Sequence, residues 1–266
     1  MTEAVLKIRN LRVLMQDAGR MVPAVDGISF DLHAGEVLAL VGESGCGKTK
    51  TAEAIMGLLP RAPASLQTGR IDLEGTDLAV LAESALRKIR GRDLSMVFQE
   101  PLTALDPVFT AGSQLAGVFR RHRGSSGAQA REQSINMLQR VGFSDAPRVM
   151  QSYPHQLSGG MRQRVVLAMA MACRPRVLIA DEPTTSLDVT TQAQVLTQLT
   201  DLGRDSGTAI LLITHDLGVV AQYCDRALVM HQGKIVEQAT VDKLFRSPGD
   251  DYTAELLSAV SRSTSP

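Results

Sequence analysis

The sequence lacks an excess of charge of either sign and has few cysteines. Its 28 Lys and Arg residues balance 28 Asp and Glu residues. This balance provides no overall attraction for nucleic acid or for an anionic membrane, and we expect no nucleic-acid partner. The three cysteines, Cys46, Cys173 and Cys224, are far apart and form no CxxC pair. Such spacing favours free thiols in a reducing compartment over a disulfide framework or a cysteine-ligated metal.

Long hydrophobic runs are missing as well. No stretch of the sequence reaches the about 18 uninterrupted apolar residues that a membrane-spanning helix needs. The start of the chain, MTEAVLKIRN, contains no basic segment leading into an apolar run, as a secretory signal does. We therefore expect a cytoplasmic protein, and if it acts at a membrane, other subunits must span it. A length of 266 residues with 44% hydrophobic residues allows one domain, or one domain with a subdomain.

The first third of the chain has the pattern of several strands followed by one helix. Residues 5–40 are expected to form short strands joined by turns. The continuous apolar run at 37–41 is typical of a strand buried on both faces of a parallel sheet. Small and apolar residues at 48–59 predict a helix that Pro60 ends. A hairpin or edge strand is expected around Gly75.

The middle of the chain changes character, and the last part returns to alternating strands and helices. Residues 101–157 are expected to be mostly helical, with a basic loop rich in glycine and serine at 120–130. Strands that alternate with helices favour an α/β fold with a parallel sheet. The later elements predicted are a helix at 161–172, a strand at 176–183, a helix at 190–207 and a strand at 209–216.

A glycine-rich loop occupies residues 42–49, GESGCGKT, between a predicted strand and a predicted helix. It matches the pattern GxxxxGK[ST] in the context that this pattern requires. Its glycines let the backbone curl, so that N–H groups point at phosphate oxygens beside the positive end of the helix dipole. Lys48 is expected to bind β and γ oxygens, and Thr49 to offer its hydroxyl to Mg²⁺. The alternative is a plain glycine-rich turn. The predicted phosphate-binding residues are Gly42, Ser44, Gly45, Cys46, Gly47, Lys48 and Thr49.

Two adjacent acidic residues close the apolar run VLIADEP. Asp181 and Glu182 lie at the carboxyl end of a predicted strand, where open α/β sheets bind ligands. Because neighbouring strand residues point to opposite sides, Asp181 can face a metal ion while Glu182 reaches toward an attacking water. We assign Asp181 to Mg²⁺ and Glu182 to the role of general base. The simpler alternative is a solvated acidic turn before Pro183.

A second glycine-containing motif occurs at residues 157–164, LSGGMRQR. Ser158, Gly159 and Gly160 precede a predicted helix and can form another nest of backbone N–H groups for an anion. The simpler alternative is a helix N-cap followed by glycines. On its own this motif is weak, because one chain rarely needs two phosphate-binding nests.

Together these motifs resemble those of an ATP-binding cassette (ABC) ATPase. GESGCGKT resembles its Walker A loop, LSGGM its signature and VLIADEP its Walker B motif. The six motifs occur in the family's order and cover nearly the whole chain. The remaining three are Gln99, which resembles the Q-loop glutamine, Ser186, Leu187 and Asp188, which resemble the D-loop, and His215, which resembles the switch histidine.

The resemblance implies a fold and a division of the chain. The implied fold is α/β, a P-loop NTPase ABC nucleotide-binding domain with a RecA-like α/β core, an antiparallel β subdomain and a helical subdomain. The ATP-binding core, with the β subdomain at its N-terminus, is expected at residues 1–100 and 158–247. The helical subdomain is expected at 101–157, and a short C-terminal segment at 248–266.

The resemblance also explains why one chain has two nests. In such ATPases two subunits meet head to tail, and the signature of one completes the Walker A site of the other. His215 is implied to contact the γ-phosphate, although a histidine after a buried strand is usually a core residue. Gln99 is implied to contact Mg²⁺ and the water, and to move the helical subdomain against a membrane partner. The signature residues implied to act on the partner's ATP are Ser158, Gly159, Gly160 and Met161.

Two positions depart from the family's pattern. Relatives usually stack an aromatic side chain on adenine, but the first aromatic residue here is Phe30, in a predicted strand. Met15 or Met21 is expected to provide a softer apolar platform, which predicts weak discrimination against GTP. Cys46 lies where serine is common, and it is either a small filler or a thiol whose pKa the helix N-terminus lowers. In the second case alkylation would block turnover, and ATP would protect the thiol.

Two longer stretches, MVFQEPLTALDPVFT and SYPHQLSGGMRQR, resemble the ATPases of dipeptide, oligopeptide and nickel importers. We expect a subunit at the cytoplasmic face of a bacterial inner membrane, with ATP and Mg²⁺ as cofactors, that drives uptake of di- or oligopeptides. The expected partners are a second, different ATPase subunit, two transmembrane permeases and, indirectly, a solute-binding protein. The sequence lacks the cysteine-containing tail of many peptide-importing relatives, which keeps nickel or metallophore import as an alternative.

Other classes of protein fit the motifs less well. A soluble ABC ATPase of DNA repair or translation would need a long coiled-coil insertion or a second cassette. A P-loop kinase or GTPase gives no role to the serine and two glycines at 158–160. A nonhydrolytic binding module would be expected to lack Glu182.

Overall fold

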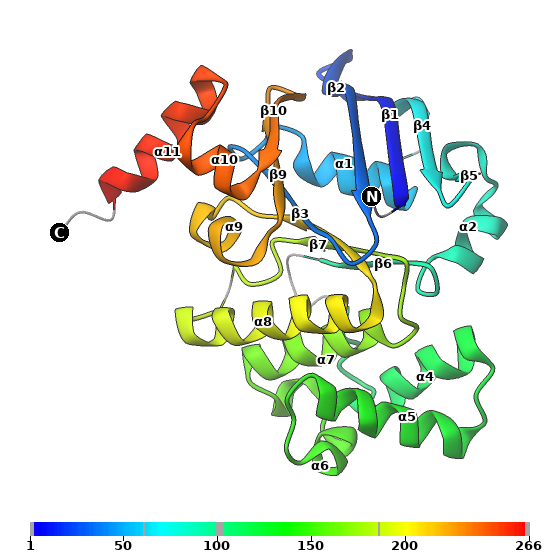
Figure 1. Cartoon of the computed structure of the whole chain (residues 1–266). Coiled ribbons are helices and arrows are strands. Elements are labelled where there is room, and N and C mark those ends of the chain that lie inside the picture. Colours follow the sequence, from blue (N-terminus) through cyan, green and yellow to red (C-terminus); the bar gives the residue numbers. More distant parts are fainter. Residues whose placement is uncertain (1–2, 61, 99–103, 186, 264–266) are drawn as a thin grey trace. The chain divides into compact units, whose positions relative to one another are not determined.

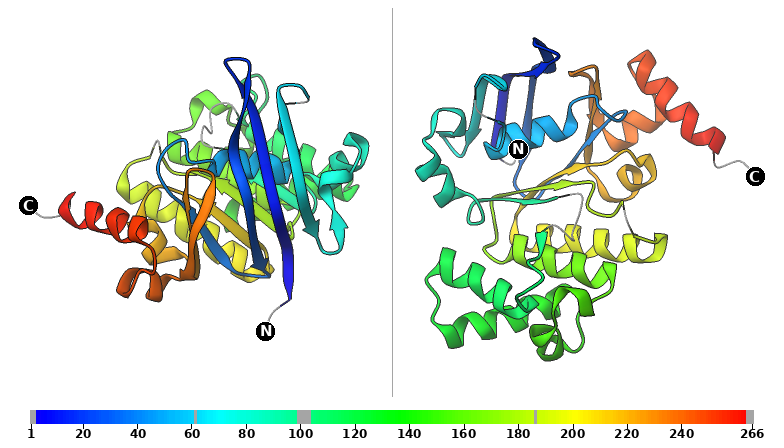
Figure 2. Two further views of the ribbon diagram at one scale, coloured as in Figure 1. Left: turned by 90° about the horizontal axis from the view of Figure 1, so that it is seen from above. Right: turned by 180° about the vertical axis from the view of Figure 1, so that it is seen from behind.

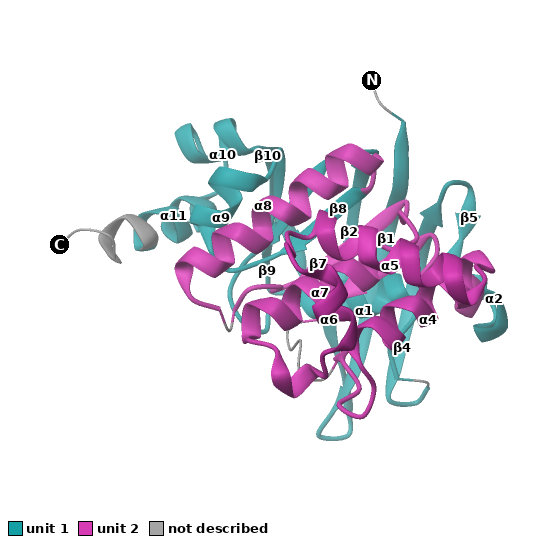
Figure 3. Ribbon diagram, turned by 90° about the horizontal axis from the view of Figure 1, so that it is seen from below, with its two compact units in different colours: residues 1–86, 209–266 teal, residues 87–208 magenta. Residues whose placement is uncertain are grey.

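The computed structural model describes residues 3–60, 62–98, 104–185 and 187–263. The chain divides into two compact units (Figure 3). Unit 1 comprises residues 1–86 and 209–266, and unit 2 comprises residues 87–208. The finer division into a core, a helical subdomain at 101–157 and a C-terminal segment stays a prediction.

Unit 1 begins with an antiparallel sheet in which β1 (Ala4–Asp17) lies between β2 (Arg20–His33) and β4 (Ser65–Leu73). These strands lie side by side in the left view of Figure 2, in blue and cyan. The short β5 (Thr76–Asp77) pairs with β4 through a turn at Gly75, where φ is 88°. The predicted hairpin around Gly75 is therefore confirmed.

The expectation of short strands near the N-terminus is wrong, because β1 and β2 are each 14 residues long. A two-residue turn joins them, with φ of 44° at Ala18 and 81° at Gly19, as tight hairpins require. The register of β1 against β2 shifts between Ile8 and Leu11, where Asn10 has a φ of 48°. Such bulges interrupt the alternation of apolar and polar residues without ending the strand.

The parallel strands of unit 1 are β3 (Val37–Val41), β8 (Ala209–Ile213) and β9 (Arg226–His231). The central strand, β3, pairs in parallel with both β8 and β9, and β10 (Lys234–Thr240) adds to β9 in the antiparallel direction. Every residue of β3 and β8 is buried. This confirms the predicted strand at 37–41 and the α/β class.

The helices of unit 1 follow its strands. The first, α1 (Lys48–Met56), ends at Gly57, whose φ of 64° gives a left-handed cap. The helix predicted to run to Pro60 therefore stops earlier, because the glycine ends it first. Figure 1 shows α10 and α11 following β10. The other helices of this unit are the 3₁₀ turn η1 (Leu78–Val80), α9 (Leu217–Tyr223), α10 (Val241–Arg246) and α11 (Asp251–Ser263). Helix α2 (Glu83–Ile89) spans the boundary between the two units.

In the described part of unit 2, two strands pair in parallel and the other regular elements are helices. Its strands are β6 (Leu94–Val97) and β7 (Val177–Asp181), which pair in parallel. In this unit α4, α5 and α6 contact one another, and α7 contacts α8. The helices are α4 (Ala111–Arg123), α5 (Gly127–Arg140), α6 (Ala146–Gln151), the 3₁₀ turn η2 (Pro154–Gln156), α7 (Gly159–Met171) and α8 (Val189–Ser206).

The basic loop predicted at 120–130 is wrong, because both flanking helices extend into it. Helix α4 continues to Arg123 and ends at Gly124, whose φ is 66°. Helix α5 begins directly after Ser126, which forms a capping box with Gln129. Its hydroxyl accepts the N–H of Gln129, and the Gln129 side chain accepts the N–H of Ser126, so two otherwise unpaired donors are satisfied.

The cysteines are free thiols, as predicted: Cys46 is buried, and Cys173 and Cys224 are half-buried. Among the residues that the structure describes, no group of three or more His, Cys, Asp or Glu side chains is placed to hold a metal ion. A helix with the length and apolar character to traverse a bilayer is likewise not found in the described ranges.

Candidate nucleotide-binding site

The glycine-rich loop connects the buried strand β3 to helix α1, and two of its glycines are required by close packing. Gly42 has a φ of 151°, and a side chain there would collide with the carbonyl oxygen of Met230 at the end of β9. Gly47 has a φ of 113°, and a side chain would collide with the carbonyl oxygen of Ala24 in β2. The loop is therefore fitted against two other strands of unit 1.

Lys48 directs its charge into the loop. Its side chain is only 6% exposed, and Nζ donates to the carbonyl oxygens of Gly42 at 2.7 Å and Glu43 at 2.8 Å. The N–H of Cys46 also donates to Glu43, at 3.3 Å. The loop thus closes on itself around the ammonium group, which gives a fixed positive charge where the motif predicts phosphate.

Helix α1 presents its amino end to the loop. Gly47 is its N-cap and supplies no side-chain hydrogen bond. The N–H groups of the first helical turn are therefore left for an anion. Ser44, Gly45 and Thr49 are exposed around this end, as a phosphate-binding loop requires.

Of the two alternatives for Cys46, the structure favours the small filler over the thiol of lowered pKa. Its side chain is 7% exposed and points inward, with Sγ 3.8 Å from the Nζ of Lys48. Burial raises the pKa of the Cys46 thiol, and the nearby charge of Lys48 offsets this only in part. The alternative of a reactive thiolate at the helix N-terminus is therefore disfavoured, and the alternative of a small buried filler fits the structure.

His215 is brought to the same edge of the sheet as the loop. It follows β8, which pairs in parallel with β3 and places Ile213 beside Leu40. The N–H of Thr214 donates to the carbonyl oxygen of Leu40 at 3.3 Å. Because parallel strands end at a common edge, the exposed His215 and the loop after Val41 lie at that edge, where such sheets bind ligands.

Met15 and Met21 cannot form one platform. In the hairpin Met15 pairs with Val22, and Met21 pairs with Gln16. Residues directly opposite each other share a face of an antiparallel ribbon, and neighbours along a strand point to opposite faces. The two methionines therefore lie on opposite faces of the hairpin, and a base bound at either face would contact one of them.

The acidic pair lies in unit 2, at the carboxyl end of β7. Asp181 is the last residue of this strand and is 5% exposed. Glu182 has a φ of 46°, so the chain turns there, and its carboxylate accepts the hydroxyl hydrogen of Thr185 at 2.9 Å. Asp181 thus belongs to the strand, whereas Glu182 lies in the left-handed turn that follows it.

The signature motif forms the start of α7. The hydroxyl of Ser158 accepts the N–H of Met161 at 3.3 Å, as an N-cap does. Ser158 and Gly159 are exposed. A side chain at Gly160 would collide with Cγ2 of Thr191, whereas one at Gly159 would make an ordinary 3.6 Å contact with Leu187.

Leu187, in the D-loop, therefore lies beside Gly159 of the signature, and Thr191, in the first turn of α8, lies beside Gly160. Asp188 is the N-cap of α8 and accepts the N–H of Thr191 at 3.0 Å. This hydrogen bond lowers the pKa of the Asp188 carboxyl. Two of the predicted site residues, Gln99 and Ser186, lie outside the described residues.

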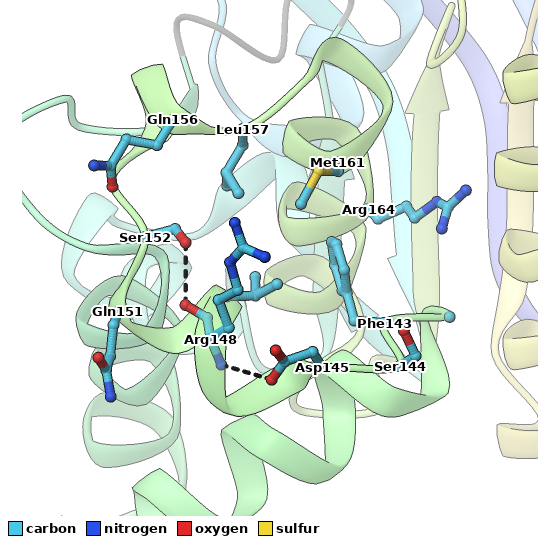
Figure 4. Close-up of a pocket in the computed structure, with 12 residues that line it drawn as sticks. Phe143, Ser144, Asp145, Arg148, Gln151, Ser152, Gln156, Leu157, Met161 and Arg164 are labelled. Atoms are coloured by element: carbon cyan, nitrogen blue, oxygen red, sulfur yellow. Dashed lines mark hydrogen bonds between the residues drawn. The ribbon is translucent and has the colours of Figure 1, made fainter.

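A cavity of about 640 Å³ lies behind the signature and was not predicted from the sequence. Figure 4 shows Phe143, Leu157 and Met161 around it. Arg148, on α6, donates its N–H to Asp145 at 3.1 Å. The side chain of Met161 thus lines a cavity within unit 2, while its N–H completes the cap at Ser158. No spacing pattern links these residues, so a sequence motif could not reveal the cavity.

Comparisons with known proteins agree with these features. The family described as ABC transporter matches residues 25–185, which is more than half of the chain. The dipeptide transport ATP-binding protein DppD of Bacillus subtilis (strain 168) is 50% identical over 260 residues, covering 98% of this chain and 78% of that protein. The oligopeptide transport ATP-binding protein AppD of the same strain is 49% identical over 255 residues, covering 96% of this chain and 78% of that protein.

A solved structure has the same fold. It is a dimer of an ATP-binding cassette in a post-hydrolysis state, bound to ADP and Pi. The TM-score is 0.78 at 26% sequence identity, and the match covers 89% of this chain and 98% of that chain. The predicted P-loop NTPase fold with an α/β core and an antiparallel sheet is therefore confirmed.

Proposed function

The chain belongs to the ABC transporter family of ATPases, and from this membership we propose that it powers a membrane importer of dipeptides or oligopeptides. The observation that carries the proposal is a sequence identity of 50% and 49% to two proteins named for dipeptide and oligopeptide transport, over nearly the whole chain. Those names disfavour the nickel or metallophore alternative. The glycine cradle around Lys48 supplies the phosphate site that such an ATPase needs.

We assign the steps of hydrolysis to the motif residues. Lys48 and the amino end of α1 hold the phosphates of ATP, and Glu182 accepts a proton from the attacking water. His215 contacts the γ-phosphate. These assignments rest on the motifs, and they are supported by the exposure of His215 at the sheet edge and by the turn at Glu182.

The motifs assign two oxygen donors of this chain to Mg²⁺. Thr49 supplies an exposed hydroxyl at the start of α1, and Asp181 supplies a carboxylate at the end of β7. Oxygen donors of this kind are those that Mg²⁺ prefers. When bound, the ion neutralises charge that develops on the phosphates. Gln99 is assigned to the same ion from its motif.

We further propose that the working site is shared between two subunits. The exposed Ser158 and Gly159 are available to the nucleotide of a partner, and a head-to-tail dimer would place them there. A second, different ATPase subunit, two permeases and a solute-binding protein complete the proposed importer. The proposed location is the cytoplasmic face of a bacterial inner membrane.

Replacement of Glu182 by Gln tests the catalytic assignment. We expect ATP turnover of the assembled transporter to fall about 10²- to 10⁴-fold, because the general base is lost. ATP binding should persist and should trap two ATPase subunits together, as measured by size-exclusion chromatography with light scattering. The control is Glu132→Gln, the same change at an exposed position of α5. Undiminished turnover in Glu182→Gln would remove Glu182 from the reaction.

Uptake by a deletion strain tests the cargo. Reintroduction of the wild-type gene should restore uptake of a labelled dipeptide or oligopeptide, and Glu182→Gln should not. Restored nickel uptake without peptide uptake would instead support the alternative and overturn the peptide assignment.

A further inference from the structure

The C-terminal helix reaches the phosphate-binding loop through one tyrosine. The hydroxyl oxygen of Tyr252, near the start of α11, accepts the N–H of Glu43 at 3.3 Å, across 209 positions of the chain. Glu43 is the second residue of the loop, directly after Gly42. No motif of the loop includes Tyr252, so this contact is separate from the phosphate-binding pattern.

Glu43 is bound by Tyr252 through its N–H and by Lys48 through its carbonyl oxygen. The carbonyl oxygen of Glu43 accepts the Nζ of Lys48 at 2.8 Å and the N–H of Cys46 at 3.3 Å. The N–H of Glu43 is bound by Tyr252. Both polar backbone groups of Glu43 are thus engaged, which fixes the orientation of the peptides at the start of the loop.

Tyr252 is itself held in place by the end of β9. Its ring lies against the ring of His231, with centroids 4.0 Å apart. His231 is the last residue of β9, and the preceding residue, Met230, is the one whose carbonyl oxygen excludes a side chain at Gly42. One strand end therefore supports the loop directly and also through the tyrosine.

Hydrogen bonds also fix the start of α11. The carboxylate of Glu237, on β10, accepts the N–H groups of Gly249 at 2.8 Å and Asp250 at 3.2 Å. Asp250 in turn accepts the N–H of Tyr252 at 2.9 Å. The next turn of the helix places Leu256 and Leu257 against an apolar cluster that contains Val41 and Val229. The helix is docked on the same strands that carry the loop.

We propose that Tyr252 is a positioning residue of the nucleotide site, through which the C-terminal helix sets the affinity of the loop for nucleotide. By fixing the Glu43 peptide before nucleotide binds, the hydroxyl lowers the conformational entropy that ordering the loop would otherwise cost. The inference rests on the ATPase function of the chain, and it adds a residue outside the known motifs to that site.

The test removes one oxygen atom. In the full-length chain, Tyr252→Phe keeps the ring on His231 and deletes the acceptor for the Glu43 N–H. We expect the Kd for ADP, measured by titration calorimetry, to rise about three- to tenfold, the range that loss of one hydrogen bond produces. The KM for ATP of the assembled transporter should rise by a similar factor, while kcat stays within about twofold.

A matched control loses the same oxygen atom elsewhere. Tyr223→Phe, at the end of α9, should leave the Kd for ADP within about twofold of wild type. A merely structural role of Tyr252 would lower the melting temperature without a selective change in the loop. Amide hydrogen exchange measures whether the loop changes selectively. Residues 41–48 should exchange faster in Tyr252→Phe than in Tyr223→Phe.

Three outcomes would overturn the inference. They are an unchanged Kd for ADP in Tyr252→Phe, an equal rise in both tyrosine variants, and unchanged exchange of residues 41–48. Tyr252→Ala, which also removes the ring, should weaken ADP binding at least as much as Tyr252→Phe, and a smaller effect would count against it. Failure of the wild-type chain to bind ADP would instead overturn the ATPase function itself, so the two failures are distinguishable.

Discussion

The Nζ atom of Lys48 lies 2.7 Å from the carbonyl oxygen of Gly42, so the last part of the phosphate-binding loop is bonded to its first residue. The lysine therefore has two tasks. It provides positive charge for phosphate, and it closes the loop by satisfying two carbonyl groups. The rigid loop around it is supported from outside by β2 and β9, whose carbonyl oxygens approach Gly47 and Gly42.

Replacement of Lys48 by Met should weaken nucleotide binding strongly. Charge-assisted hydrogen bonds are worth about 1.5–3 kcal/mol each, which corresponds to a rise in the Kd for ATP of about 10- to 150-fold. The two carbonyl groups left without the ammonium should also lower the melting temperature of the chain. Titration calorimetry and differential scanning calorimetry measure the two effects.

Lys50→Met is the matched control for that substitution. Lys50 lies on the same helix but pairs with Glu53 at 2.7 Å, away from the loop interior. Partly exposed pairs of this kind are worth less than about 1 kcal/mol, so nucleotide affinity should be nearly unchanged. Equal losses in the two variants would show that net charge, and not the position of Lys48, determines affinity.

Replacement of Gly160 by Ala should destabilise unit 2 and displace the signature. The added Cβ would collide with Cγ2 of Thr191 on α8. Overpacking of this kind costs about 1–3 kcal/mol. Since each kcal/mol lowers the melting temperature by about 2–4 °C in a chain of this size, a fall of several degrees is expected. Thermal unfolding followed by circular dichroism measures it.

Two further variants separate this collision from a general effect of alanine. Thr191→Ser removes Cγ2, so the double variant Gly160→Ala with Thr191→Ser should recover most of the lost stability. Gly159→Ala places its Cβ at an ordinary contact distance of 3.6 Å from Leu187 and should change stability by less than about 0.5 kcal/mol. Absence of rescue in the double variant would contradict the proposed collision.

The parts of the fold that could be predicted are those with local causes. A continuous apolar run encodes β3, and the glycines with Lys48 encode the loop, because the backbone conformation depends on the residues at those positions. The N-cap role of Ser158 also follows from its own side chain and the helix after it. The structure contains all three features, which could be predicted without knowledge of any distant residue.

Features set by distant residues could not be predicted. The length of β1 was missed because the bulge near Asn10 breaks the alternation, although pairing with β2 and β4 continues past it. The inward position of Cys46 depends on how the loop is fitted against strands elsewhere in unit 1. The contact of Tyr252 with Glu43 joins opposite ends of the chain, and no local pattern marks it.

Cys46 should react slowly with thiol reagents in the folded protein. The thiolate is the reactive form, and burial both shields the thiol and raises its pKa. At pH 7.5 we expect N-ethylmaleimide to modify Cys46 at least about tenfold more slowly than in the urea-unfolded chain. Peptide mass spectrometry after timed quenching measures the rate, and ATP should have little further effect. Rapid modification of Cys46 in the folded protein would contradict its burial.

The raised pKa of Cys46 also determines the direction in which stability changes with pH. Because the folded pKa of Cys46 lies above the ordinary value of 9.0, the unfolded thiol ionises first as pH rises. The contribution to stability is complete below about pH 9 and is lost as pH rises above it. The fall in melting temperature between pH 7.5 and 9.5 should therefore be smaller in Cys46→Ser than in wild type. An equal fall would show that other groups control this range.

Nucleotide choice should be weak, because the hairpin offers only one methionine to a base. Met15 and Met21 lie on opposite faces, and a thioether contact does not distinguish the hydrogen-bonding edges of adenine and guanine. Hydrogen bonds to a base edge provide about 1–3 kcal/mol of discrimination, so without them GTP should compete for bound ADP within about tenfold of ATP. Met15→Ala and Met21→Ala should differ. One of them should weaken the binding of ATP and GTP equally, and the other should leave the binding of both unchanged. A preference for ATP above about a hundredfold would show that polar groups read the base, and the methionine platform would then be wrong.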